Sequence, residues 1–215
     1  MLEVSGLNVA YGESHVIRDV SLHVAPDEAI AVMGRNGMGK TTLLKSLIGL
    51  LPARSGHIRL CGADITALPS YRRVAQGLAF VPQGRMVFPF LTVEQNILSG
   101  AAKSGHRTVP EYLYRFFPVL KDMRQRKAGN LSGGQQQMLA IARALISEPK
   151  VLILDEPTEG IQPSIIKEIA QTLNVLRAER GFAVVVSEQV LSFALDLADR
   201  FLVIDRGRLV HDEAR

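Results

Sequence analysis

The chain has 215 residues, which is long for one average domain and short for two, so its core needs no disulfide or metal to be stable. Its hydrophobic fraction of 47% includes no run of about 18 residues that could span a bilayer, and no basic stretch precedes an apolar one at the amino terminus, which excludes a secretory signal. The net charge of +4 requires no polyanionic partner, and the single cysteine, Cys61, excludes an internal disulfide and is expected in a packed, apolar position.

The first third of the chain predicts an antiparallel sheet. Residues Leu2–Ala10 and Val16–Val24 alternate apolar and polar side chains, and a turn that contains glycine separates them. A further short strand is expected at His57–Leu60. Alternation of this kind is typical of strands that bury one face and expose the other.

A glycine-rich segment follows the expected strand Ala29–Met33. Its sequence, GRNGMGKT at Gly34–Thr41, matches the phosphate-binding loop in full, and a helical run follows at Leu43–Leu50. The glycines let several backbone N–H groups point at one anion, and the N-terminal end of the helix attracts negative charge. We expect Lys40 to contact the β- and γ-phosphates of a nucleotide and the Thr41 hydroxyl to bind Mg²⁺. The expected nucleotide-binding residues of this segment are Gly34, Arg35, Asn36, Gly37, Met38, Gly39, Lys40, Thr41 and Thr42.

Short apolar strands alternate with helices in the rest of the chain. Nearly continuous apolar runs are typical of parallel strands covered on both faces, and here they are Ala29–Met33, Leu78–Val81, Val151–Leu154, Ala183–Val186 and Phe201–Ile204. Between Gly84 and Ser147 no such run appears, and the expected helices there are Thr92–Ala102, Val109–Phe117 and Gly133–Ile146. The pattern predicts an α/β core with a mostly helical insertion at about residues 84–147.

A basic group within the insertion permits two interpretations, a nucleic-acid contact or a solvated helix face. It consists of Lys121, Arg124, Arg126 and Lys127. No aromatic side chains interleave with it to stack bases, and the nearby ring, Phe117, lies upstream. The solvated face is favoured, and we expect no nucleic-acid partner.

Two carboxylates follow the strand Val151–Leu154. Asp155 could hold the Mg²⁺ shell, and Glu156 could polarise an attacking water, a role that typically contributes about 10²–10⁴-fold to a rate. An acidic pair after a strand is by itself more often a polar strand end. Together with the phosphate-binding loop, it predicts nucleotide hydrolysis.

The segment Leu131-Ser132-Gly133-Gly134-Gln135 opens the expected helix Gly133–Ile146. Its glycines allow close approach, Ser132 offers a hydroxyl, and the helix N-terminus attracts anions. The phosphate-binding loop, this segment and Asp155-Glu156 occur in the order of the ATP-binding cassette (ABC) ATPases, which the chain resembles over nearly its full length.

This resemblance implies a fold and an assembly. The fold is a P-loop NTPase of the α/β class, a single ABC ATPase domain over residues 1–215 with a parallel core sheet, an antiparallel β subdomain and a helical insertion. The assembly is a head-to-tail dimer, in which the signature Leu131–Gln135 contacts the γ-phosphate of ATP bound to the opposite subunit. The implied cofactors are ATP and Mg²⁺.

Further positions match the family one by one. Tyr11 stands where the family stacks an aromatic ring on adenine, although a strand-end aromatic is the alternative. Gln83 matches the glutamine that touches Mg²⁺ and the attacking water, and it begins a segment that reaches the membrane partner. Phe88, Pro89 and Phe90 in that segment either line the cleft for a transporter's cytoplasmic helix or pack inside the insertion. The expected metal ligands are Thr41, Gln83 and Asp155.

Two positions depart from the family. Gln189 stands where a histidine usually contacts the γ-phosphate, and its amide can donate a hydrogen bond but carries no charge. Gln162 lies in a loop just after the acidic pair, where the family commonly has an aspartate that acts across the dimer. The residues expected to act in catalysis are Glu156, Gln83 and Gln189.

The glutamine at position 189 is characteristic of importer subunits for branched-chain amino acids and for urea. Three segments look most like the urea-importer ATPase subunit: GRNGMGKTT at Gly34–Thr42, GRMVFP at Gly84–Pro89 and EGIQPSII at Glu159–Ile166. A branched-chain amino acid importer is the alternative.

The expected function is therefore that of an ATP-hydrolysing motor, cytoplasmic and peripheral on the inner face of the cell membrane. It would energise transport through two membrane-spanning permease subunits, served outside by a solute-binding protein, with a second ATPase subunit that is expected to be a different chain. A soluble ABC protein acting on DNA or ribosomes is less expected, because those proteins usually carry two cassettes or a long coiled coil. A nucleotide-dependent binding module with little turnover is a third interpretation, suggested by Gln189 and Gln162.

Overall fold

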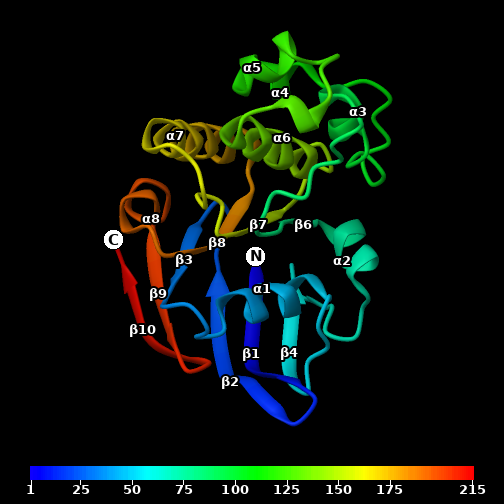
Figure 1. Cartoon of the computed structure of the whole chain (residues 1–215). Coiled ribbons are helices and arrows are strands. Elements are labelled where there is room, and N and C mark those ends of the chain that lie inside the picture. Colours follow the sequence, from blue (N-terminus) through cyan, green and yellow to red (C-terminus); the bar gives the residue numbers. More distant parts are fainter.

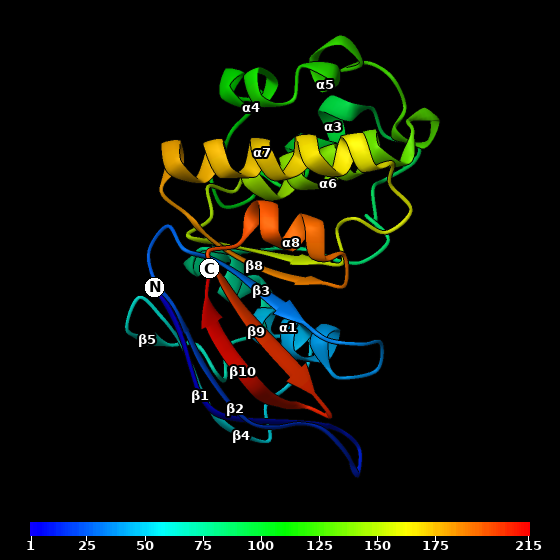
Figure 2. The same cartoon turned by 90° about the vertical axis from the view of Figure 1, so that its left-hand side faces the viewer.

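The computed structural model describes residues 1–215 and contains two sheets (Figures 1 and 2). The larger sheet has six strands in the order β10-β9-β3-β8-β7-β6. Five of them run parallel, and β10 pairs antiparallel with β9 at one edge. The strands are β3 (Ala29–Met33), β6 (Leu78–Val81), β7 (Val151–Asp155), β8 (Ala183–Glu188), β9 (Arg200–Asp205) and β10 (Arg208–Ala214).

The smaller sheet is antiparallel and has the order β2-β1-β4-β5. Its strands are β1 (Leu2–Tyr11), β2 (Ser14–Val24), β4 (Ser55–Leu60) and β5 (Ala63–Asp64). Alternate residues of β1, such as Leu2 and Val4, are buried while Glu3 between them is exposed. The predicted antiparallel sheet is thus confirmed.

The helices lie around and between these sheets. They are α1 (Lys40–Ile48), α2 (Ser70–Gln76), α3 (Val93–Leu98), α4 (Glu111–Phe116), α5 (Pro118–Asp122), the short 3-10 helix η1 (Ala128–Asn130), α6 (Gly133–Leu145), α7 (Pro163–Arg180) and α8 (Leu191–Leu197). Helices α3 to α6 gather at the end of the molecule drawn uppermost in Figure 1. None of the helices is both long and apolar enough to cross a membrane.

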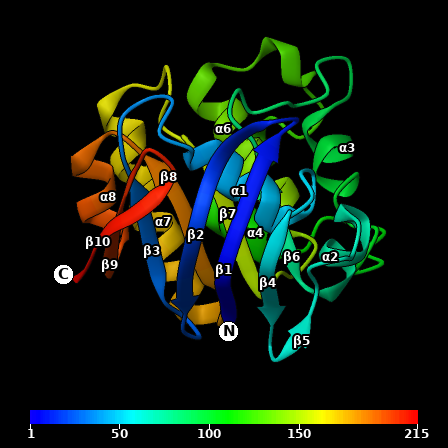
Figure 3. The same cartoon turned by 90° about the horizontal axis from the view of Figure 1, so that it is seen from below.

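Two apolar cores cover the two faces of the parallel sheet. Ile30 and Val32 of β3 belong to the core that also contains α1 and the antiparallel sheet, whereas Ala29 and Ala31 belong to the core formed with α6, α7 and α8. Viewed from below, α1 lies behind β1 and β2, and its apolar residues share a core with theirs (Figure 3). The sheet is therefore buried on both faces, which explains its continuous apolar strands.

The strand predictions for the parallel sheet are confirmed, and no strand lies between residues 84 and 147. The strands β5 and β10 were not foreseen, because β5 has two residues and β10 is exposed along nearly its whole length. The helix expected at Thr92–Ala102 is shorter and ends at Leu98. The expectation for Cys61 was wrong: it is exposed, in the turn between β4 and β5, with a left-handed backbone (φ 51°).

Candidate functional site

The glycine-rich loop joins β3 to α1. Gly39 has φ 109°, and a Cβ atom there would lie 2.9 Å from the Ile17 side chain, so no other residue fits without displacement. Lys40 begins α1 and is 4% exposed. Its Nζ donates hydrogen bonds to the carbonyl oxygens of Gly34 (2.8 Å) and Arg35 (3.3 Å), so the loop curls around the ammonium group.

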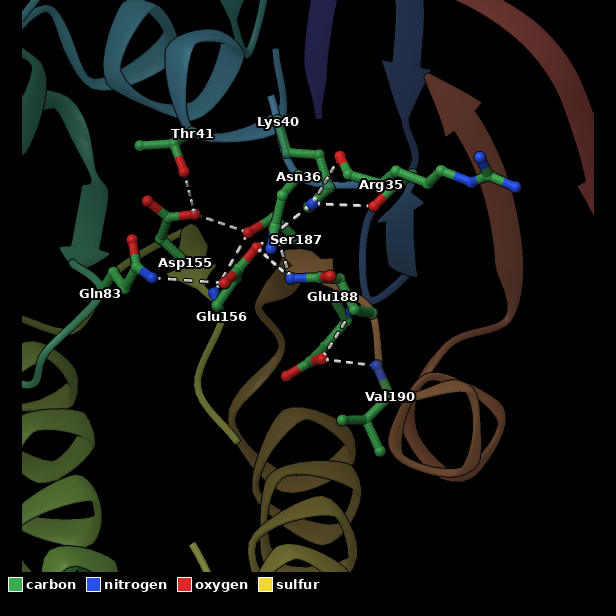
Figure 4. A network of polar contacts seen from close by, with 12 residues as sticks. Arg35, Asn36, Lys40, Thr41, Gln83, Asp155, Glu156, Ser187, Glu188 and Val190 are labelled. Atoms are coloured by element: carbon green, nitrogen blue, oxygen red, sulfur yellow. Dashed lines mark hydrogen bonds and ion pairs between the residues drawn. The ribbon is translucent and has the colours of Figure 1, made fainter. Parts of the chain in front are cut away.

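The carboxyl ends of three neighbouring strands bring the other polar residues to this loop. Strands β3, β8 and β7 lie side by side and run parallel, so the residues that follow them meet at one edge of the sheet. Figure 4 shows Lys40 and Thr41 above Asp155, Glu156 and Ser187 at this edge. Residues more than 100 positions apart thereby form one polar network.

Asp155 is a buried acid of the network, with 2% of its surface exposed. Its Oδ1 accepts hydrogen bonds from Thr41 Oγ1 (3.0 Å) and Ser187 Oγ (2.6 Å). Burial raises the pKa of the Asp155 carboxyl; the hydrogen bonds from Ser187 and Thr41 oppose this shift, and the charge of Glu156 adds to it. A cation bound here would favour the charged form of Asp155 and so oppose this shift.

Three of the predicted site residues contact the Glu156 carboxylate. Its Oε1 lies 3.2 Å from Lys40 Nζ and accepts a hydrogen bond from Gln189 Nε2 at 2.9 Å, and its Oε2 accepts one from Gln83 Nε2 at 3.3 Å. Its backbone is left-handed (φ 44°), a conformation that costs a non-glycine residue about 1–3 kcal/mol. Strain of this kind clusters at functional sites, and here it turns the carboxylate toward the loop.

A cavity of about 240 Å³ lies in front of this network. Its lining residues are Val16, Asn36, Gly37, Gly39, Lys40, Thr41, Thr42, Gln83 and Glu156. Backbone N–H groups, an ammonium group and the start of a helix in one cavity form a site suited to phosphate groups. A carboxylate beside them can orient or polarise a water molecule.

The residues expected to hold Mg²⁺ also fit this ion chemically. Thr41, Asp155 and Gln83 would supply hydroxyl, carboxylate and amide oxygens, and Mg²⁺ in nucleotide sites typically takes one or two such ligands together with waters and phosphate oxygens. No group of three or more His, Cys, Asp or Glu side chains that could hold a metal ion occurs in the chain. The donor set therefore suits an ion that arrives with a phosphate ligand.

Two predicted elements lie outside the lining of the cavity. Tyr11 is 47% exposed and is the last residue of β1. The turn that joins β1 to β2 projects to the same side as the loop between β3 and α1 (Figure 2). The signature Leu131–Gln135 lies at the start of α6, in a different part of the chain (Figure 1). The structure therefore does not bring the signature to the phosphate-binding loop of its own chain.

The signature forms a capped helix start. Ser132 is the N-cap of α6: its hydroxyl accepts a hydrogen bond from the Gln135 N–H (3.4 Å), and the Gln135 side chain accepts one from the Ser132 N–H (2.9 Å). Gly134 packs against α7 so closely that a Cβ atom would lie 2.7 Å from Ile165 Cγ2. Ser132 itself is exposed, so its hydroxyl faces solvent at the positive end of a helix.

The two positions that depart from the family lie in different surroundings. The Gln189 amide donates to Asn36 Oδ1 (2.7 Å) as well as to Glu156, so it joins the phosphate-binding loop to the acidic pair. Gln162 is the exposed N-cap of α7 and makes no capping hydrogen bond with its side chain. Gln189 is thus part of the network, and Gln162 is not.

Two polar residues of the network were missed from the sequence. Ser187 donates to Asp155 and accepts the Glu156 N–H (3.1 Å), and Glu188 accepts hydrogen bonds from the loops on both sides of it. Both end the apolar strand β8. The signal that singled out Asp155 and Glu156, polar residues directly after a buried strand, applies equally to this pair.

Comparisons with a family model and with known proteins both find ABC transport proteins. A family model described as ABC transporter matches residues 17–159. The high-affinity branched-chain amino acid transport ATP-binding protein BraG of Pseudomonas aeruginosa is 43% identical over 99% of this chain and 92% of its own length. The probable branched-chain amino acid transport ATP-binding protein LivF of Archaeoglobus fulgidus is 38% identical over 97% of this chain and 90% of its own.

Solved structures agree with these relatives. A dimeric, post-hydrolysis ATP-binding cassette bound to ADP and Pi superimposes with a TM-score of 0.87 at 25% identity, over 100% of this chain and 98% of that one. The family match contains the phosphate-binding loop, the signature and Asp155-Glu156. The chain therefore belongs to the ABC transporter family, as an ATP-hydrolysing cassette whose activity is coupled to transport.

Proposed function

We propose that this chain is the ATP-binding and ATP-hydrolysing subunit of an importer for branched-chain amino acids. The observation that carries the substrate class is the 43% identity with a branched-chain amino acid transport protein over 99% of the chain. The Gln189 position agrees with it, because importers of this group characteristically carry glutamine there. No residue of this subunit contacts the transported solute in this proposal.

The network around Glu156 supports a division of roles in hydrolysis. Lys40 and the loop N–H groups bind the phosphates, and Glu156 accepts a hydrogen bond from the water that attacks the γ-phosphorus. The bond from the γ-phosphorus to the β–γ bridging oxygen breaks as the new P–O bond forms, the Glu156 carboxylate takes the proton of the water, and ADP and inorganic phosphate leave. Gln83 and Gln189, which already donate to Glu156, orient its carboxylate and the γ-phosphate.

We propose Mg²⁺ as the second cofactor, held by Thr41, Asp155 and Gln83. The hydrogen bond from Thr41 to Asp155 shows that the two side chains are within reach of a common ligand position. When bound, Mg²⁺ would neutralise charge on the β- and γ-phosphates. It would also offset the burial of the Asp155 carboxylate.

The separation of the signature from the loop supports a composite site. A phosphate-binding loop and a signature that do not meet within one chain can meet across a head-to-tail pair of cassettes. The related cassette that was solved as a dimer in a post-hydrolysis state agrees with this arrangement. We propose that the signature Leu131–Gln135 contacts the γ-phosphate of ATP bound to a second cassette, and that Tyr11 stacks on the adenine of the ATP bound to its own chain.

An exposed apolar segment supports docking to the permease subunits. Met86, Phe88 and Phe90 are 67%, 49% and 84% exposed, and they follow Gln83 directly in sequence. Met86 and Phe88 line a groove with small residues of α6, and the Arg143 guanidinium lies over the Phe88 ring. We propose that a cytoplasmic segment of a membrane-spanning permease docks in this groove, so that the chain works peripherally on the inner face of the membrane.

Uptake measurements test the substrate class. Source cells with and without the gene would be given labelled leucine and labelled urea. We expect leucine uptake to fall and urea uptake to stay unchanged. A fall in urea uptake alone would leave the ATPase role intact and contradict the amino-acid assignment.

Urea is the second candidate, and specific residues favour it. The sequences GRNGMGKTT at Gly34–Thr42 and EGIQPSII at Glu159–Ile166 resemble the urea-importer ATPase subunit. The relatives at 43% and 38% identity favour the amino-acid importer instead. The same uptake experiment separates the two.

A further inference from the structure

Glu188 is a buried acid that no part of the proposed hydrolysis uses. It is 1% exposed at the end of β8, and it forms no ion pair in the structure. Burying a carboxylate without a cation is costly unless hydrogen bonds satisfy its oxygens. The contacts of Glu188 show how this cost is met.

Four donors from two loops satisfy the Glu188 carboxylate. Oε1 accepts hydrogen bonds from the Thr158 hydroxyl (2.5 Å) and the Thr158 N–H (3.2 Å), both in the loop after Glu156. Oε2 accepts them from the N–H groups of Gln189 (2.7 Å) and Val190 (2.9 Å), in the loop after β8. An ionised carboxylate has about four acceptor positions, and all are used.

The two loops that Glu188 joins have different tasks in the proposed site. Gln189 donates to Glu156 and Asn36 and so contacts the nucleotide cavity. Thr158 leads into the exposed segment Glu159–Gln162, which the family resemblance places at the surface between cassettes. A carboxylate saturated from both sides holds these loops at a fixed spacing.

We propose that Glu188 is a positioning residue that fixes Gln189 relative to Thr158, so that Gln189 and the segment Glu159–Gln162 move as one unit. The inference rests on the proposed roles of Glu156 and Gln189. It adds a mechanical link between the nucleotide cavity and the surface between cassettes. No hydrogen bond joins Glu188 to the phosphate-binding loop itself, so we expect its substitution to change kcat rather than KM for ATP.

Substitution of Glu188 by glutamine tests the link. The amide keeps the size of the side chain but offers one acceptor oxygen, so its NH₂ group must face the donors of either Thr158 or Gln189 and Val190. In the full chain, we expect Glu188→Gln to lower kcat for ATP hydrolysis about tenfold, within the roughly 10²-fold that a displacement of 1 Å can cost, with KM for ATP unchanged. A wild-type kcat would overturn the proposal.

A second pair of variants keeps the test valid if Glu188→Gln folds poorly. Thr158→Val removes the hydroxyl donor and leaves the backbone donor, and we expect kcat to fall about threefold to tenfold. Thr158→Ser retains the hydroxyl and should restore the wild-type kcat. Equal kcat values for the serine and valine variants would overturn the proposal.

Two controls separate this link from general stability and from the site itself. Asp199 also accepts a backbone N–H, that of Ala29 (2.9 Å), but at the opposite ends of the strands, so Asp199→Asn should lower the melting temperature and leave kcat unchanged. If Glu188→Gln and Asp199→Asn both lower kcat in proportion to melting temperature, Glu188 has only a structural role.

Glu156→Gln is measured in parallel. Full activity of that variant would refute the proposed site. Its inactivity beside a fully active Glu188→Gln would refute the link alone.

Discussion

The two glycine-rich regions of the chain use their polar groups differently. Around the phosphate-binding loop, Lys40, Asp155 and Glu156 are buried or nearly buried; Lys40 and Glu156 form an ion pair, and Asp155 accepts a hydrogen bond from Thr41. At the signature, the side chains of Ser132 and Gln135 bond only to each other's backbone N–H, in a capping box. One region is assembled within the chain, and the other presents a helix start to the outside.

This difference shows how the work of hydrolysis is divided in the proposed function. The loop and the acidic pair are held by strand ends of one sheet, so their spacing is set by the fold of a single chain. The signature is held by α6 and by the close contact of Gly134 with Ile165 of α7. Its position relative to a nucleotide then depends on how two cassettes meet.

Replacing Glu156 tests the region assembled within the chain and has the largest expected effect. Glu156→Gln should lower kcat by about 10²–10⁴-fold, because an amide cannot accept a proton from water, while ATP binding persists through Lys40 and the loop. Phosphate release and nucleotide binding are the measurements. Glu168→Gln, an exposed glutamate on α7, is the matched control. Equal rates for the Glu156 and Glu168 variants would refute the catalytic role.

Two capping boxes of the same design sharpen the comparison. Thr92 caps α3 as Ser132 caps α6, each with a glutamine three residues later. If Ser132 and Thr92 act only as helix caps, Ser132→Ala and Thr92→Ala should each lower the free energy of unfolding by about 0.5–2 kcal/mol. If Ser132 also contacts a phosphate, its variant alone should lose about tenfold in ATPase rate. Equal rates in both variants would limit Ser132 to capping.

The buried Asp155 predicts a smaller, pH-dependent effect. Because burial raises its pKa in the folded state, the free energy of unfolding should be higher below the unfolded pKa, near 3.8, and fall as pH rises through the folded pKa. Asp155→Asn should therefore stabilise the nucleotide-free chain at pH 7, by about 1.4 kcal/mol per unit of raised pKa, and the gain should shrink as pH falls.

Chemical unfolding across about pH 4–8 measures this effect. The exposed Asp122→Asn serves as the control, measured under the same conditions. A gain for Asp155→Asn that is constant with pH would show that charge burial is not its cause. ATP hydrolysis by this variant should fall, since the carboxylate is a proposed Mg²⁺ ligand.

Much of the fold could be predicted because its strands are buried on both faces. Runs such as Val151–Leu154 are continuous and apolar, so their place in a parallel sheet follows from hydrophobicity alone. Strand β10 has no such run: nearly all of its residues are exposed, and it is held by pairing with the preceding strand β9. Backbone pairing at an exposed edge leaves no continuous apolar run in the sequence, and β10 was therefore missed.

The sequence predicted which residues form the site, but not the hydrogen bonds and backbone conformations that join them. The loop pattern and the acidic pair identified Lys40 and Glu156, because each follows a buried strand. That Glu156 has a left-handed backbone and receives the Gln189 amide depends on neighbouring strands and is visible only in the structure. The substrate class was least accessible, since the segments resembling urea importers and the full-length relatives point to different solutes.

Mixing two inactive variants tests the central claim most directly, namely that the signature of one cassette completes the phosphate site of another. Lys40→Ala removes the loop cation, and Ser132→Arg fills the signature; each chain alone should hydrolyse ATP at background rate. A mixed pair contains one site with an intact loop from one chain and an intact signature from the other, so ATPase activity should return on mixing. A mixture as inactive as its components would contradict the account.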